Sequence, residues 1–216
     1  MKKEWEKYWG KQKNSFFGRL ASFYRKKVLA NAVEYYTEKY FPKSGLFLEC
    51  GSGSSQSSVK LRKHNRTYIA VDISGKALKE ARKIPQISKV LVADIRKLPY
   101  KNESVEGIWN LGVMEHFTEK QIQQILNEFY RVLKKNRTAI LFWPPVFGSS
   151  QIALGFVEWL MHLFTRKKFK FFPDEFTRLK SRSHAESIIS RTNFRIRRID
   201  FSFRDFFTHM VLVLEK

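Results

Sequence analysis

Three carboxylates stand near the ends of successive predicted strands. Glu49, Asp72 and Asp94 each follow a short apolar run, and a fourth such run ends in Asn110. The carboxyl ends of parallel strands share one edge of a sheet, which is where ligands of open α/β sheets bind. A single strand-terminal Asp often serves only a turn, but three isolated carboxylates are costly to bury together. We therefore expect this edge to accept hydrogen bonds from hydroxyl, amino and ammonium groups of a ligand.

The first carboxylate, Glu49, is followed by a loop with small side chains, within the segment LFLECGSGSSQSS at residues 46–58. Gly51 and Gly53 allow the backbone to approach a ligand closely. The dinucleotide fingerprint G-x-G-x-x-G fails, because its sixth position is Gln56. Glu49 would also repel a pyrophosphate. The loop favours a ligand with a cationic amino-acid moiety and no phosphate, and it disfavours an NAD-type oxidoreductase.

The elements that position these residues alternate along the chain. Apolar runs predict strands at 46–50, 67–73, 89–95, 105–112 and 138–144, and helical patterns lie between them at 57–64, 74–83 and 118–136. In the last helix, Thr118 and Gln121 form a capping box and Asn136 suits a left-handed C-cap. Alternating strands and helices predict a parallel sheet with right-handed crossovers.

The two ends of the chain differ from this pattern. The first 41 residues are typical of helix, and the second helical stretch ends before Pro42. Helices are predicted at 150–164 and 183–192, followed by closing strands at 194–203 and 209–216. We expect a Rossmann-like, doubly wound α/β fold with about seven mostly parallel strands, the last antiparallel. The predicted organisation is a helical cap at 1–44 and a main domain at 45–216, with a helical insertion at about 148–180.

Composition limits the class of protein. The only cysteine, Cys50, excludes an internal disulfide framework and suits a reducing cytoplasm. The N-terminus has no signal-peptide pattern, and the longest apolar run, 152–164, is too short to span a bilayer. These features predict a soluble cytoplasmic protein, with peripheral membrane attachment as an open alternative.

The net charge is strongly positive. The 41 Lys and Arg residues outnumber 20 acids, and the formal charge is +21. Such a field favours an anionic partner, either RNA or an anionic membrane surface. The excess is spread along the whole chain, so a solvated lysine-rich surface explains it equally well.

The motifs together resemble a known family. LFLECGSGSSQSS, YIAVDIS, VLVADIRKLPYKNESVEGIWNLGVMEHF and YRVLKKNRTAILFWPP are similar, in order and spacing, to the motifs of class I S-adenosylmethionine-dependent methyltransferases. The likeness covers roughly residues 44–145 and is greatest for the small-molecule, methyltransferase type 11-like subgroup. It implies a methyltransferase with S-adenosylmethionine as cofactor and S-adenosylhomocysteine as product.

The resemblance also implies roles for single residues. Glu49 would face the methionine amino group, Asp72 the ribose hydroxyls and Asp94 the adenine amino group. The full set of implied cofactor-binding residues is Glu49, Cys50, Gly51, Ser52, Gly53, Asp72, Ile73, Asp94, Ile95, Asn110 and Leu111. One departure from the family pattern is Ser55, which replaces the usual third glycine of the loop.

The acceptor chemistry is less defined. His116 is the candidate general base, because its unperturbed pKa lies near neutrality, or it only packs near the cofactor. Related quinone O-methyltransferases carry E-x-x-E-H here, a metal-ligand constellation. This chain has Gly112 at the first position, so we expect no metal.

The acceptor itself is expected to be a small or lipid-like molecule. Tyr8 and Trp9 are candidates for a lid over the cofactor, and helix 150–164 is a lid, a dimer contact, an interfacial membrane helix or a plain core helix. An RNA methyltransferase is one alternative, although NLGVMEHF lacks the N/D-P-P-aromatic signature of base-amino methylation. A non-catalytic cofactor-binding or scaffolding subunit is the other.

Overall fold

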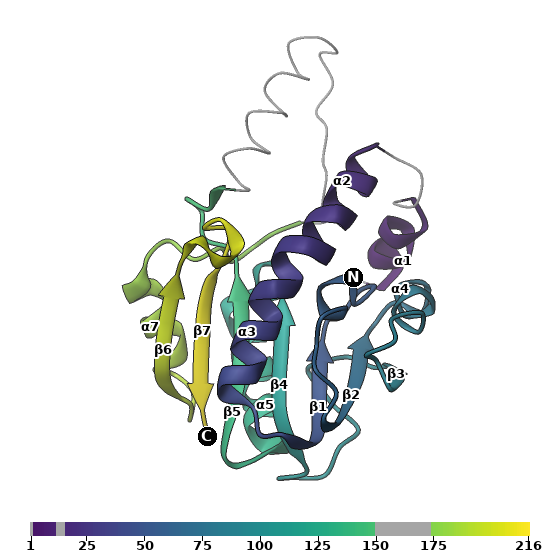
Figure 1. Cartoon of the computed structure of the whole chain (residues 1–216). Helices are drawn as coiled ribbons and strands as arrows, with labels where there is room; N and C mark the ends of the chain where they lie inside the picture. Colours follow the sequence, from purple (N-terminus) through teal and green to yellow (C-terminus); the bar gives the residue numbers. More distant parts are fainter. Residues whose placement is uncertain (1, 12–15, 150–173) are drawn as a thin grey trace.

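The computed structural model describes residues 2–11, 16–149 and 174–216, and one seven-stranded sheet organises them (Figure 1). The strand order is β3-β2-β1-β4-β5-β7-β6. The strands are β1 (Ser44–Cys50), β2 (Asn65–Asp72), β3 (Lys89–Val92), β4 (Val105–Leu111), β5 (Leu133–Trp143), β6 (Arg195–Phe201) and β7 (Met210–Glu215). Strands β1 to β5 pair in parallel, and β7 runs antiparallel to both of its neighbours. The predicted fold class, including the antiparallel last strand, is confirmed.

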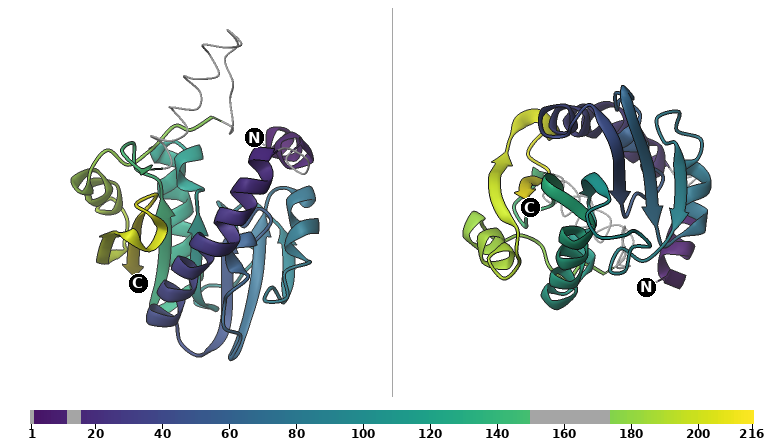
Figure 2. Two further views of the ribbon diagram at one scale, coloured as in Figure 1. Left: turned by 45° about the horizontal axis from the view of Figure 1, so that its top comes forward. Right: turned by 90° about the horizontal axis from the view of Figure 1, so that it is seen from below.

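Helices cover both faces of the sheet because successive strand residues point to opposite sides. Phe47 lies in one core cluster with α3 (Ala30–Tyr40), and its neighbour Leu48 lies in the other cluster with α5 (Glu119–Val132). Residues of α4 (Gly75–Ala81) and α7 (Arg182–Ile189) join the first and second cluster, respectively. Figure 2 shows these two layers of helices from further directions.

Helix α5 confirms its predicted start and corrects its predicted end. Thr118 and Gln121 form the reciprocal capping box. The helix stops at Val132, and β5 begins at Leu133 because that residue already pairs with the start of β4. Asn136 does take a positive φ of 58°, but it does so inside β5, where its N–H donates to the Lys216 carbonyl over 3.1 Å. It is therefore not a helix C-cap.

The predicted helix at 57–64 is wrong. Only a single 3₁₀ turn, Gln56–Ser58, forms between β1 and β2. Its backbone bonds join residues three apart, from Ser58 to Ser55 and from Leu61 to Ser58. Serine side chains compete for backbone groups and disfavour helix interiors. Helix α3 contacts this turn, so the preceding helix covers this part of the sheet.

The N-terminal region is helical, as predicted. Helix α1 (Lys2–Lys11) lies beside α4 at the rim of the sheet, and α2 (Phe16–Tyr24) continues through a π-helical turn, η2 (Arg25–Leu29), into α3 (Figure 1). The predicted helix 150–164 lies outside the described residues. Within the ranges that the structure describes, no helix has the length and apolar character needed to cross a membrane.

Candidate functional site

The glycine loop after β1 adopts a conformation that requires its glycines. Gly51 and Gly53 have φ values of +72° and +52°, in the left-handed region that L-residues rarely occupy. A Cβ on Gly51 would lie 2.6 Å from Val113, and one on Gly53 would lie 2.4 Å from the Trp9 ring. Ser55 also has a positive φ, 51°. Ser55 therefore holds a left-handed conformation that glycine would adopt more readily, at a cost in strain.

Beside this loop the structure gathers buried polar atoms that have no hydrogen-bond partner among the described residues. They are Glu49 Oε2, the Ser52 hydroxyl and both polar side-chain atoms of Asn110. The hydroxyls of Ser55 and Ser58 lie close enough to Glu49 to act on its pKa, although burial outweighs them. Buried polar groups are normally paired, and an unpaired one costs on the order of 1–3 kcal/mol. Burial raises the pKa of Glu49 to about 7. An ammonium group and other hydrogen-bonding ligand atoms would satisfy this cluster.

Asp72 fastens the glycine loop to helix α4. Its Oδ2 accepts from the Gly53 N–H and its Oδ1 from the Ser74 N–H, each over 2.8 Å. The side chain is buried, and this burial raises its pKa. Each carboxylate oxygen has a further lone pair, so Asp72 can also accept from ligand hydroxyls.

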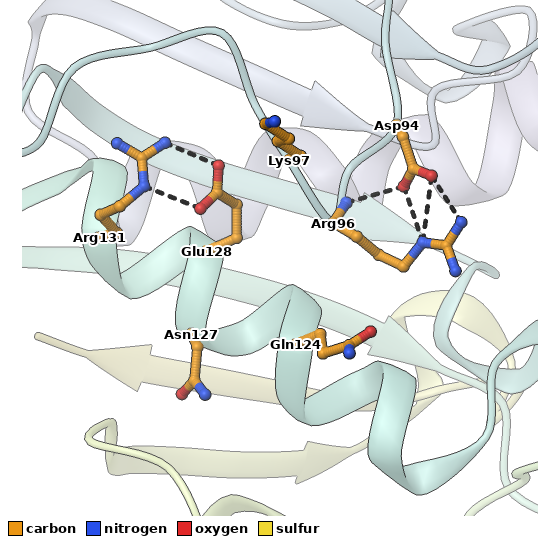
Figure 3. Close-up of a pocket in the computed structure, with 7 residues that line it drawn as sticks. All are labelled: Asp94, Arg96, Lys97, Gln124, Asn127, Glu128 and Arg131. Atoms are coloured by element: carbon orange, nitrogen blue, oxygen red, sulfur yellow. Dashed lines mark hydrogen bonds and ion pairs between the residues drawn. The ribbon is translucent and has the colours of Figure 1, made fainter.

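Asp94 is occupied by a neighbour. The Arg96 guanidinium donates hydrogen bonds to the Asp94 carboxylate from Nε and from Nη2, and the bond from Nη2 is 2.6 Å long (Figure 3). Hydrogen bonds from Arg96 lower the pKa of Asp94. Both residues line a surface pocket of about 550 Å³ against α5, which neither Glu49 nor Asp72 lines. An adenine amino group at Asp94 would have to share the carboxylate with Arg96.

The remaining predicted cofactor-binding residues differ in how deeply their side chains are buried. The side chains of Cys50 and Ile95 pack in the core, so only their backbone groups can reach a ligand. Burial raises the pKa of the Cys50 thiol well above its ordinary value. Ile73 and Leu111 are half-buried at the carboxyl ends of β2 and β4.

His116 and Glu115 form a buried pair after β4. His116 Nδ1 lies 2.9 Å from the Asp174 carbonyl. A carbonyl can only accept, so Nδ1 carries the proton and Nε2 is the free base. Burial lowers the pKa of His116 and raises that of Glu115 to about 8. The nearest carboxyl oxygen of Glu115 is 3.8 Å from Nε2, and Glu115 Oε2 has no partner within the described part of the chain.

Helix α1 lies across this same edge. The Trp5 ring contacts His116 edge-on, with 4.8 Å between ring centroids, and the Trp9 ring packs on Gly53. Tyr8 contacts both tryptophan rings. The Gly75 N–H donates to Glu6 Oε1 over 2.7 Å. The helix thus bridges the glycine loop, the start of α4 and His116.

Sequence reasoning missed three of these residues. Glu115 stands beside His116 in the chain, and a glutamate amid apolar neighbours was the available signal. Trp5 and Trp9 are four residues apart and therefore on one helix face, which was a signal for Trp5. The sequence carried no signal for Glu6, because its partner is a backbone group 69 residues away.

The polar groups at this edge are compatible with the chemistry of S-adenosylmethionine, because the buried oxygen of Glu49 can accept from an ammonium group and Asp72 can accept from hydroxyls.

Comparisons with known proteins give a family match and structures of the same fold. Residues 48–141 match the family described as "Methyltransferase domain". No curated protein matches the sequence.

Among solved structures, an S-adenosylmethionine-dependent methyltransferase from Archaeoglobus fulgidus is 13% identical, with a TM-score of 0.66, over 94% of this chain and 100% of that one. Magnesium protoporphyrin IX methyltransferase from Synechocystis, with bound S-adenosylhomocysteine, is 16% identical, with a TM-score of 0.63, over 99% and 93%.

A third similar structure is geranyl diphosphate C-methyltransferase from Streptomyces coelicolor. It is 13% identical, with a TM-score of 0.57, over 85% of this chain and 78% of that one. At such identities these structures establish the shared fold. The family match identifies residues 48–141 as a methyltransferase domain.

Proposed function

We propose that this protein transfers the methyl group of S-adenosylmethionine to a small or lipid-like acceptor at the carboxyl edge of the sheet. The observation that carries the proposal is the cluster of buried, unpartnered polar atoms around Glu49 and Asn110. Such atoms are destabilising unless a ligand pairs with them. They lie at the strand ends where open α/β sheets bind ligands.

Each residue at this edge has a defined task in the proposal. Glu49 holds the ammonium of the methionine part, and Asn110 offers both a donor and an acceptor nearby. Asp72 accepts hydrogen bonds from the ribose hydroxyls and also from the Gly53 N–H. The bound cofactor supplies an electrophilic methyl group on a sulfonium, and positioning then provides most of the acceleration.

His116 is the proposed general base. Its Nδ1 proton is held by the Asp174 carbonyl, which leaves Nε2 to accept a proton from an acceptor hydroxyl or amine as the methyl group arrives. Its lowered pKa keeps the ring neutral near pH 7. Glu115, whose pKa is about 8, is mostly protonated at that pH and can donate a hydrogen bond to the same acceptor.

The acceptor class follows from the surroundings of His116. The edge of Trp5 and the buried side chains of Val113 and Met114 make this end of the site largely apolar. Two structures of the same fold are named for acceptors with large apolar parts, a porphyrin and geranyl diphosphate. An apolar acceptor with one nucleophilic group fits this environment.

The testing experiment is calorimetric titration with S-adenosylmethionine and S-adenosylhomocysteine, with NAD as the negative control. We expect both sulfur compounds to bind and NAD not to bind. Asp72→Ala should weaken binding about ten- to a hundredfold, because hydrogen bonds to a charged group contribute about 1.5–3 kcal/mol. The matched control Glu80→Ala, on the exposed side of α4, should bind like the wild type.

Two results would contradict the proposal. One is the absence of binding to either sulfur compound by folded protein. The other is unchanged affinity in Asp72→Ala, with the fold checked by circular dichroism.

A further inference from the structure

Five phenylalanine rings form a continuous exposed cluster around the turn between β6 and β7. The exposed fractions are 44% for Phe147, 37% for Phe201, 68% for Phe203, 44% for Phe206 and 40% for Phe207. Ring-centroid distances of 4.7–6.2 Å link them in one chain of contacts. We call these five residues the phenylalanine cluster. Exposed aromatic rings in contact with one another mark an interaction surface far more than single exposed residues do.

The backbone is strained to hold two of these rings. Phe206 and Phe207 are consecutive and have φ values of 55° and 58°. A bulky residue in the left-handed region is an outlier that lowers the stability of the fold. Such strain persists only where the surroundings enforce it, and it concentrates at functional positions.

A buried polar network enforces this turn. Asp205 is almost fully buried, and its Oδ2 accepts from the His209 N–H over 2.9 Å and the Thr208 hydroxyl over 3.0 Å. The Tyr24 hydroxyl donates to the Asp205 carbonyl over 2.7 Å. Ser149 binds the carbonyls of Phe206 and Phe207 through its hydroxyl and its N–H. These hydrogen bonds therefore hold the turn in the conformation that exposes the rings.

The surroundings of the cluster are basic. The π-helical turn η2 contacts the 3₁₀ turn η5 (Phe203–Asp205), and η2 carries the exposed Lys26 and Lys27. Arg204 lies within the turn itself, and Asp205, the one acid there, is buried. The protein as a whole carries +21. Lysines beside an apolar surface attract anionic lipid headgroups.

The cluster also lies at the same edge of the sheet as the glycine loop. Strand β6 ends at Phe201 and runs parallel to β5, because both are antiparallel to β7. The β6–β7 turn therefore lies at the carboxyl edge. Helix α2 lies at the same edge, as Figures 1 and 2 show.

We propose that the phenylalanine cluster is a docking surface for an anionic lipid bilayer. The rings enter the interface between headgroups and acyl chains, and Lys26 and Lys27 contact anionic headgroups. Aromatic side chains flanked by cations have the chemistry that binds such interfaces. The inference deepens the proposed function, since a surface at this edge would present the site to lipid-like acceptors.

The test is flotation of the full-length protein with vesicles, without cofactor or acceptor. We expect binding to phosphatidylcholine vesicles that contain phosphatidylglycerol and little binding to phosphatidylcholine alone. Phe203→Ser should weaken binding at least about tenfold, because a ring that enters the interface contributes about 1.5 kcal/mol or more. Its matched control is Val92→Ser, an exposed apolar residue on β3, the opposite edge strand.

A charge-reversal pair tests the cationic part separately. The double variant Lys26→Glu and Lys27→Glu should lose about tenfold or more of the affinity for anionic vesicles. The control, Lys101→Glu and Lys135→Glu, makes the same change in net charge at the amino ends of β4 and β5 and should bind normally.

Three outcomes would overturn the inference. One is no binding to anionic vesicles. Another is a wild-type dimer that Phe203→Ser dissociates, which would assign the cluster to a second copy of the chain. The third is that Phe203→Ser lowers the melting temperature but binds lipid no differently from the wild type. This result would assign the phenylalanine cluster to packing against other residues of the same chain. Cofactor titration needs no vesicles, so the proposed function and this inference can fail independently.

Discussion

The two edges of the sheet differ in how their buried charged side chains are paired. At the amino edge, the fully buried Arg66 side chain binds Glu38 and the carbonyls of Phe41 and Pro42. Glu106, also at this edge, pairs with two cations, Lys134 and Arg137. At the carboxyl edge, Glu49, Asn110 and Glu115 keep buried atoms without partners in the described part of the chain.

The pKa directions follow the same division. Burial alone would raise the pKa of Glu38, but hydrogen bonds from Lys43 and Arg66 hold it at about 2. At the other edge burial prevails for Glu49 and Glu115 and raises their pKa values to about 7 and 8, whereas Arg96 lowers the pKa of the less buried Asp94. The amino edge is thus organised for stability. At the carboxyl edge, buried polar groups without partners lower the stability of the fold but remain available to bind a ligand.

The largest effect is expected at the amino edge. Glu38→Gln leaves the buried Arg66 guanidinium without its charge partner, so the free energy of unfolding should fall by about 3 kcal/mol. Urea unfolding measures this change. Cofactor affinity of the folded variant should not change. The matched control Glu80→Gln removes an exposed pair with Lys83 and should cost no more than about 0.5 kcal/mol. A small effect of Glu38→Gln would show that the amino edge is not the stabilising one.

At the carboxyl edge, a substitution should stabilise the protein in a pH-dependent way. The pKa of Glu115 rises from 4.5 to about 8 on folding. Below pH 4.5 both states are protonated and the burial has no titration cost. As pH rises from 4.5 to 8, the unfolded state releases its proton first, so stability is lost over this range.

Glu115→Gln removes that loss. We expect equal stabilities near pH 4 and a variant more stable by about 2 kcal/mol at pH 6, measured by urea unfolding across this range. Parallel pH curves for the variant and the wild type would show that Glu115 is not held protonated by burial.

The smallest effect concerns a single proton. Because burial lowers the pKa of His116, its imidazole should titrate below the ordinary value of 6.5, and its nitrogen shifts should identify the tautomer protonated at Nδ1. An NMR titration measures both, with the signal assigned through His116→Gln. His184→Gln, in helix α7, should leave that signal unchanged. A neutral ring protonated at Nε2 would remove His116 as the proposed base.

How much was predictable depends on the range of the interactions involved. The strands with Glu49, Asp72 and Asn110 at their ends, the capping box at Thr118 and the antiparallel closing strand were all readable from local patterns. The end of α5 and the missing helix at 57–64 were not, because strand pairing with β4 and coverage by α3 decided them.

Local patterns in the sequence were sufficient to predict the fold class and to place carboxylates at one edge of the sheet. The reason is that apolar periodicity and the residues at strand ends are local properties. The tertiary structure was needed to show that one carboxyl oxygen of Glu115 is buried without a partner among the described residues and that α1 lies over the glycine loop. It also decided that the phenylalanine cluster is exposed, since the same rings in the chain could equally have formed a core. Burial and pairing depend on residues far apart in the chain, and no local pattern encodes them.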